Sequence, residues 1–88
     1  MKLILAILRA DAVDPVSRAL VDQKYPVTKI SSVGGFLRSG NTTLVIGVEE
    51  NKVQEVLDAI REACSQLHGG AAHAATIFVL NAAQFVQI

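Results

Sequence analysis

The sequence predicts an α+β protein with the ferredoxin-like order β-α-β-β-α-β, in which an antiparallel sheet carries two helices on one face. Three observations lead to this prediction. Four short runs are apolar or rich in β-branched residues, as strands are. Two longer segments repeat apolar residues at helical spacing. Two right-handed βαβ halves joined in this order bring both helices to the same face of the sheet.

The first strand is Lys2–Leu8, whose residues KLILAIL are apolar on both faces, as in a strand that is buried on both sides. A helical pattern begins at about Asp11, with one apolar face formed by Val16, Ala19 and Leu20. Asp11 or Asp14 is expected to cap this helix, because a carboxylate accepts hydrogen bonds from the free amides of a first turn. Tyr25-Pro26 is expected to end it, since proline lacks the backbone donor.

The second strand is VTKIS, starting at Val27, and the third is TTLVIGV, Thr42–Val48. A glycine-containing loop, SSVGGFLRSGNTT, joins them. Asn51 and Gln54 have the spacing of a capping box before the clearest helix. The apolar residues of that helix recur at helical spacing: Val53, Val56, Leu57, Ile60, Cys64 and Leu67.

A short connection, His68–Ala74, leads to the last strand, Thr76–Leu80. The remaining residues, NAAQFVQI, could turn back and add an edge strand. Cys64 lies on the apolar face of its helix and is interpreted as a core residue rather than a nucleophile. His68 and His73 have no carboxylate or thiolate beside them, so no metal site is predicted.

Composition narrows the possible functions. The 88 residues predict one domain, residues 1–88. A formal net charge of zero argues against nucleic-acid polymers as partners, because these require a basic face. The single cysteine allows no internal disulfide and fits a reducing compartment, so we expect a cytoplasmic protein. The apolar run LILAIL is too short to span a bilayer, and no membrane partner is expected.

The first and last strands predict self-association. Both Lys2–Leu8 and Thr76–Leu80 are apolar on their two faces, whereas helices in this fold cover only one face of the sheet. The uncovered face would be a large apolar patch, which soluble monomers rarely expose. We therefore expect a homo-oligomer, and a ring is the economical closed form.

The segment TKISSVGGFLRSGNTTLVIGV, residues 28–48, resembles the core motif of the PII-like cyclic-di-AMP receptors, and ATIFVLNAAQFVQI resembles the end of the same family. This resemblance implies a homotrimer that binds the signalling nucleotide in clefts between subunits and reports it to a protein target. It also implies a non-enzymatic role without a cofactor. The positions that match ligand-contacting positions of the family are Thr28, Phe36, Leu37, Asn41, Gly47, Phe78 and Gln87.

The residue types agree with an adenine nucleotide, cyclic-di-AMP above all. Phe36 and Leu37 can form an apolar wall for adenine, and Asn41 can donate and accept at the ring edge. Gly35 allows the backbone close to a ligand. Arg38 can approach a phosphate, or it can brace the trimer instead.

The sequence also departs from the family that it resembles, and these departures leave a second function open. The sequence departs from the family's binders at Lys24, where they carry asparagine, and at Pro26, where they carry a basic residue. The connection at His68–Ala74 is also much shorter than theirs. An alternative is therefore a PII-like oligomeric scaffold that has lost nucleotide binding.

An enzyme of the same topology fits less well. Acylphosphatases share the order of elements, but the segment RADAVDP after the first strand lacks the glycines of their phosphate-binding loop.

Overall fold

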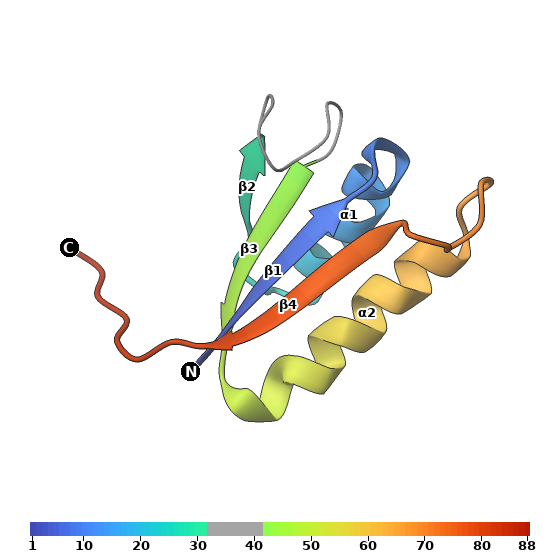
Figure 1. Ribbon diagram of the computed structural model, residues 1–88. Coiled ribbons are helices and arrows are strands. Elements are labelled where there is room, and N and C mark those ends of the chain that lie inside the picture. Colours follow the sequence, from blue (N-terminus) through green and yellow to red (C-terminus); the bar gives the residue numbers. More distant parts are fainter. Residues whose placement is uncertain (32–41) are drawn as a thin grey trace.

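The structure, a computed structural model, describes residues 1–31 and 42–88 (Figure 1). Its strands form one antiparallel sheet in the order β2-β3-β1-β4, as the ferredoxin-like prediction requires. The elements are β1 (Lys2–Leu8), α1 (Val13–Asp22), β2 (Thr28–Ser31), β3 (Thr42–Val48), α2 (Val53–Ser65) and β4 (Ala75–Asn81). The predicted strands at Lys2–Leu8 and Thr42–Val48 are confirmed residue for residue.

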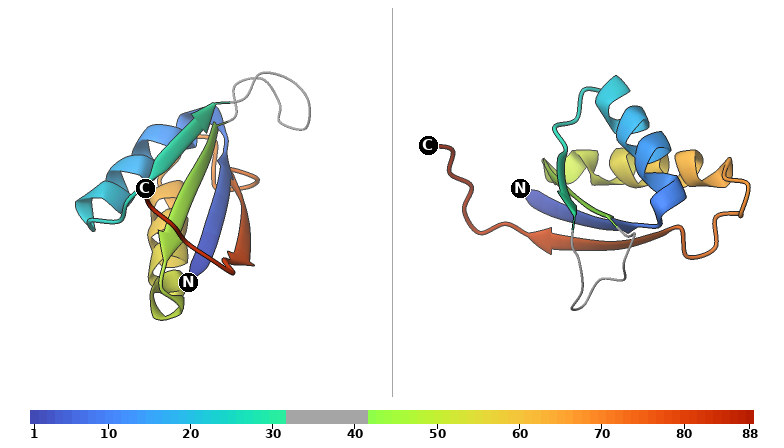
Figure 2. Two further views of the ribbon diagram at one scale, coloured as in Figure 1. Left: turned by 90° about the vertical axis from the view of Figure 1, so that its left-hand side faces the viewer. Right: turned by 90° about the horizontal axis from the view of Figure 1, so that it is seen from above.

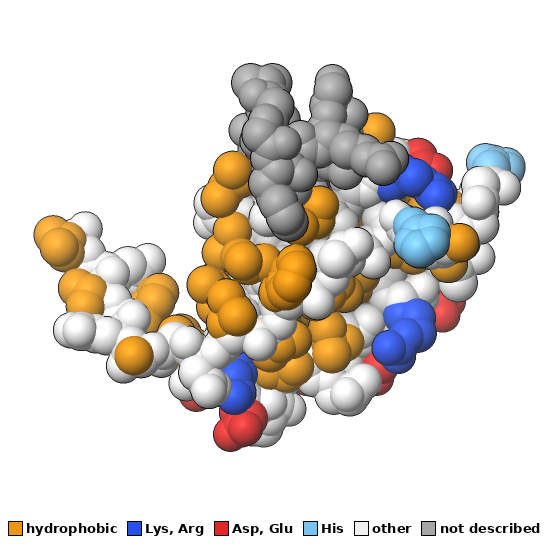
Figure 3. Space-filling view, viewed as in Figure 1, with side chains coloured by type: hydrophobic (Ala, Val, Ile, Leu, Met, Phe, Trp, Pro, Cys, Tyr) orange, Lys and Arg blue, Asp and Glu red, His pale blue; other side chains and the backbone are white. Residues whose placement is uncertain are grey.

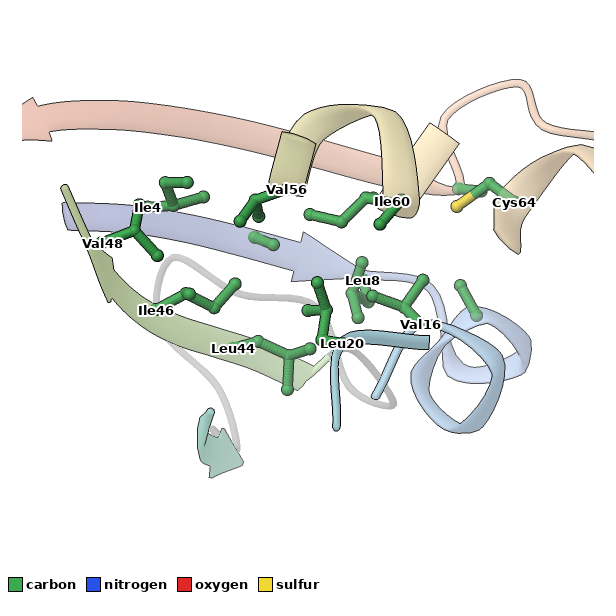
Figure 4. Close-up of a cluster of buried hydrophobic side chains, with 14 residues drawn as sticks. Ile4, Leu8, Val16, Leu20, Leu44, Ile46, Val48, Val56, Ile60 and Cys64 are labelled. Atoms are coloured by element: carbon green, nitrogen blue, oxygen red, sulfur yellow. The ribbon is translucent and has the colours of Figure 1, made fainter. Parts of the chain in front are cut away.

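The molecule has two layers, because both helices lie on the same face of the sheet (Figure 2). Burial alternates along the two central strands: β1 buries Ile4, Ala6 and Leu8, and β3 buries Leu44, Ile46 and Val48. Val56, Ile60 and Cys64 of α2 and Val16 and Leu20 of α1 complete the core from the helical side (Figure 4). Cys64 is 4% exposed, which confirms its interpretation as a core residue.

Neither helix starts as the sequence predicts. A 3₁₀ turn precedes each one, at Ala10–Ala12 and at Glu50–Lys52, and no side chain caps either start. Backbone bonds close these turns: Ala12 N–H donates to the Arg9 carbonyl at 2.8 Å, and Lys52 N–H donates to the Glu49 carbonyl at 2.9 Å. Local 3₁₀ bonding therefore replaces the expected carboxylate cap and capping box.

The end of α1 is sharply defined and lies before Tyr25-Pro26, as predicted. Tyr25 N–H donates to the Leu20 carbonyl at 3.0 Å and Lys24 N–H to the Val21 carbonyl at 2.9 Å, which is the Schellman pattern. Lys24 adopts the left-handed conformation that this pattern demands, with φ 65°. Glycine is the residue that usually occupies such a position, because a Cβ is unfavourable there.

The segment after β4 does not form the additional edge strand that was considered possible. Ala82 N–H donates to the Met1 carbonyl at 3.1 Å, and this bond continues the β1–β4 pairing by one residue. From there residues 83–88 lead away from the body of the molecule (Figure 1). Across residues 1–31 and 42–88, no helix is long and apolar enough to cross a membrane.

Replacing Lys24 with glycine should stabilise the protein. We expect Lys24→Gly to raise the free energy of unfolding by about 1 kcal/mol, since it removes the Cβ penalty of the left-handed conformation. Urea unfolding at a fixed protein concentration measures this change. Gln23→Gly, one residue earlier and outside the left-handed region, is the control and should not stabilise. A lower stability for Lys24→Gly would contradict the Schellman assignment.

Candidate ligand site on the open face of the sheet

The face of the sheet opposite the helices is apolar, and none of the described helices or strands covers it (Figure 3). We call it the open face. The strand register and the alternation of burial assign eleven residues to it: Leu3, Leu5, Ile7, Thr28, Ile30, Thr43, Val45, Gly47, Thr76, Phe78 and Leu80. Phe78 is 45% exposed and Leu80 is 44% exposed. Large side chains of this kind are normally covered in a soluble protein.

Three of the predicted ligand residues share this face. The register aligns Thr28, Val45, Leu5 and Phe78 in one row across the sheet. Thr28 and Phe78 therefore lie on opposite edge strands, about 14 Å apart, since neighbouring strands are separated by about 4.8 Å. Gly47 lies one row further along β3, opposite Leu3. The protomer brings these residues to one surface but does not bring Thr28 and Phe78 into contact.

Gly47 forms a small notch in the open face. A Cβ at this position would meet only the Met1 sulfur, at 3.8 Å, which is an ordinary contact distance. The packing of the protomer therefore does not require glycine here. Glycine within a strand is unfavourable and commonly marks the close approach of another molecule or backbone.

The other predicted ligand residues are not joined to this surface by the described structure. Gln87 is exposed in the segment after β4, which leads away from the body of the molecule in the right-hand view of Figure 2. Gly35, Phe36, Leu37, Arg38 and Asn41 lie outside the described residues. The segment that contains them connects β2 to β3, and β3 begins at Thr42, directly after Asn41.

A polar cluster that sequence reasoning missed lies where β1 ends. Arg9 donates to both carboxylate oxygens of Asp11, at 2.6 Å from Nε and 3.0 Å from Nη2. The same guanidinium donates to the carbonyls of Ala72 and Gly70, at 3.2 and 3.0 Å. The backbone of Gly69 passes so close to Arg9 that a Cβ at this glycine would lie 3.3 Å from Nη2 of the guanidinium. Arg9 thus ties the short connection between α2 and β4 to the start of the first helical segment.

The charges of this cluster shift each other's protonation equilibria. The hydrogen bond from Arg9 lowers the pKa of Asp11 below its ordinary value of 3.8, and the same bond raises the pKa of Arg9. The only signal in the sequence was the tripeptide Arg9-Ala10-Asp11, which places opposite charges two residues apart. Its partners lie more than sixty residues away along the chain, so the cluster could not be assembled before the topology was known.

A groove of about 460 Å³ runs between β4 and α2, on the helical side of the sheet. Leu57, Ile60 and Cys64 line it from α2, and Ile77 and Val79 line it from β4. Burial raises the pKa of the Cys64 thiol, which keeps it in the unreactive protonated form. Among the described residues, no group of three histidine, cysteine or carboxylate side chains is placed to hold a metal ion.

Comparisons with known proteins place the chain in a family. The profile described as cyclic-di-AMP receptor matches residues 1–69. The nitrogen fixation nifHD region GlnB-like protein 1 of Methanothermococcus thermolithotrophicus is 38% identical over 78 residues, which cover 74% of this chain and 74% of that protein. The crystal structure of a functionally unknown protein from Pediococcus pentosaceus ATCC 25745 is similar, with a TM-score of 0.79 and 37% identity over 99% of this chain and 96% of that chain.

The chain therefore belongs to the cyclic-di-AMP receptor family, whose members are PII-like signalling proteins that bind a nucleotide. The family resemblance inferred from the glycine-containing motif is confirmed. The profile extends through the first three strands and both helices and stops at residue 69, within the connection that Arg9 holds. The part of the chain that contains Phe78 and Gln87 lies beyond it.

The Arg9–Asp11 pair should make stability depend on pH at the acid end. Because the pKa of Asp11 is lowered on folding, its contribution is complete above 3.8 and is lost as the pH falls through the lower folded value. We expect Asp11→Asn to be less stable than the parent at pH 7, and this difference to shrink at about pH 3. Urea unfolding at both pH values measures it.

Asp22→Asn, at the other end of α1, is the matched control and should show no such dependence. The same stability difference between Asp11→Asn and the parent at both pH values would mean that the Arg9–Asp11 contact does not persist in solution.

Proposed function

We propose that this protein is a non-enzymatic cytoplasmic receptor that binds cyclic-di-AMP in clefts between the subunits of a homotrimer and relays the signal to a protein target. The observation that carries this proposal is the open face. It is apolar, no described helix or strand covers it, and it holds Thr28, Gly47 and Phe78. Membership of the cyclic-di-AMP receptor family supports the same ligand.

The separation of Thr28 and Phe78 favours a site between subunits. The two residues lie on opposite edge strands of one sheet, with Val45 and Leu5 between them. When copies pack their open faces together, the β2 edge of one copy can approach the β4 edge of another. A crevice formed in this way would have Thr28 on one wall and Phe78 on the other.

The segment between β2 and β3 would supply the remaining ligand contacts. Phe36 and Leu37 are suited to the faces of an adenine ring, and Asn41 to its polar edge. Gly35 would allow the backbone to approach, and Arg38 would pair with a phosphate. These roles follow from residue type and family membership, and the binding experiment below tests them.

A second candidate function is a PII-like scaffold that assembles without a nucleotide. One specific observation favours it. The connection between α2 and β4 is short, and Arg9 holds it at the Gly70 and Ala72 carbonyls. A segment fixed in this way is poorly suited to rearrange around a ligand. The scaffold and the receptor share the same assembly and differ in ligand binding alone.

Calorimetry with purified protein separates the two candidates. We expect cyclic-di-AMP to bind more tightly than cyclic-di-GMP, ATP, ADP or AMP. The apolar wall of Phe36 and Leu37 and the side-chain amide of Asn41 suit adenine, and this ligand has two adenine bases. Asn41→Ala should weaken the binding about tenfold, the effect of losing roughly 1.4 kcal/mol of hydrogen bonding. Asn51→Ala, an exposed asparagine in the turn before α2, is the control and should bind as the parent does. If none of the five nucleotides binds at millimolar concentration, the receptor is excluded and the scaffold remains.

Light scattering tests the assembly independently of any ligand. We expect a particle of three times the 9.4 kDa protomer mass. Leu5→Glu places a charge in the middle of the open face and should reduce the mass to that of one protomer, with the circular dichroism unchanged. Val21→Glu is the matched control, because Val21 is exposed on α1, away from the open face. A parent protein that is monomeric at all concentrations would overturn the trimer.

A further inference from the structure

Two apolar features of the described structure lack a partner, and neither belongs to the open face. One is the groove between β4 and α2, formed by Leu57, Ile60 and Cys64 on one side and Ile77 and Val79 on the other. The second is the segment 82–88, which carries Phe85, Val86 and Ile88. Phe85 is 63% exposed, Val86 is 62% exposed, and Ile88 is fully exposed.

The strand that borders the groove has a free edge. β4 is the last strand in the order β2-β3-β1-β4, so within the described sheet only β1 pairs with it. It is seven residues long, and its sequence ATIFVLN contains no charge and no proline. Natural edge strands usually carry such residues to prevent pairing with another chain. The β4 edge has none, and it is therefore suited to accept an additional strand.

The segment 82–88 has the pattern that such an edge accepts. Phe85 and Val86 are good strand formers, and alternate side chains of an extended segment point to opposite faces. Val86 and Ile88 share one face, while Phe85 and Gln87 share the other. A strand added beside β4 would therefore direct the first pair into the groove and the second pair to the open-face side, beside Phe78.

The segment of the same chain does not reach this edge. Ala82 N–H is bonded to the Met1 carbonyl, which continues the β1–β4 ladder by one residue pair and keeps Ala82 in line with β4. A tight reversal would have to occur within Asn81-Ala82-Ala83-Gln84, a stretch that contains no glycine or proline for the turn. The right-hand view of Figure 2 shows the segment leading away from the body of the molecule, as Figure 1 does.

We propose that residues 82–88 of a second copy of this chain add as a strand to the outer edge of β4, with Val86 and Ile88 filling the groove between β4 and α2. The second copy thereby delivers its Gln87 beside Phe78. For that role of Gln87 at a ligand, the inference rests on the proposed function. The docking itself does not, because it depends only on the free edge, the apolar groove and the exposed apolar segment.

Disulfide trapping between differently tagged chains tests the docking without any nucleotide. Both chains carry Cys64→Ala, one carries Val79→Cys, and the other carries Val86→Cys. They are coexpressed so that mixed assemblies form, and the purified protein is mildly oxidised. We expect a linked product that contains both tags, because a disulfide requires Cβ atoms about 3.5–4.5 Å apart. Ile77→Cys replaces Val79→Cys in a parallel experiment, to cover the neighbouring register.

Control variants make the outcome decisive. Arg18→Cys, on α1 and away from the groove, replaces Val79→Cys and should yield no product with Val86→Cys. Val86→Lys with Ile88→Cys in one chain should also lose the product, because an ammonium group is unfavourable among the apolar side chains of the groove and beside Arg61, which also lines it. No product at either Ile77→Cys or Val79→Cys would overturn the inference. So would a disulfide found only within one chain when both cysteines are on the same molecule.

The same preparations distinguish failure of the docking from failure of the receptor function. Cyclic-di-AMP binding without a trapped product would remove the docking and leave the receptor. A trapped product without nucleotide binding would leave the docking and support the scaffold. If both hold, we expect Gln87→Ala to weaken cyclic-di-AMP binding about tenfold while the yield of trapped product stays unchanged.

Discussion

The organisation of this protein depends on one constraint, which is that two helices can cover only one face of a four-stranded sheet. The helices bury the side chains of Ile4, Ala6 and Leu8 and of their neighbours on β3 almost completely. The alternate residues of β1, Leu3, Leu5 and Ile7, are equally apolar, but no described helix or strand covers them. Water disfavours such a surface, so the sequence of β1 already implies a further layer from outside the protomer.

This constraint also links assembly to recognition. In the proposed assembly, covering the open face would bring the edges of neighbouring sheets together, and the predicted ligand residues lie on those edges and beside them. Thr28 is on β2 and Phe78 is on β4, at opposite ends of one row. A Cβ at Gly47 would fit among the described residues of the protomer, so their packing does not require glycine at this position. In the proposed receptor, ligand binding would therefore depend on assembly, because the Thr28 wall and the Phe78 wall of one crevice come from different copies.

The sequence predicted what depends on periodicity. Apolar or β-branched runs placed the strands, helical spacing placed both helices, and the two apolar faces of the first and last strands indicated the open face. The sequence did not predict the features that depend on backbone geometry or on contacts between distant segments. The helix starts use 3₁₀ backbone bonds in place of Asp11, Asp14 or the Asn51 box. The Arg9 cluster joins segments more than sixty residues apart. Thr28, Gly47 and Phe78 were predicted as ligand positions from the family resemblance alone, and the strand register was needed to show that they share one face and how far apart they lie.

The turn between α1 and β2 explains how this chain can depart from its family's motif close to the site. The Schellman bonds and the left-handed Lys24 set the direction of the chain before Thr28. Asparagine, which the family's binders carry at this position, tolerates that conformation better than lysine does. Pro26 keeps an extended φ and needs no hydrogen-bond partner for its nitrogen. Substitutions at Lys24 and Pro26 therefore change the groups that a phosphate could meet without changing the path that positions Thr28. Ligand preference in this protein can thus differ from that of its relatives while the fold and the assembly stay the same.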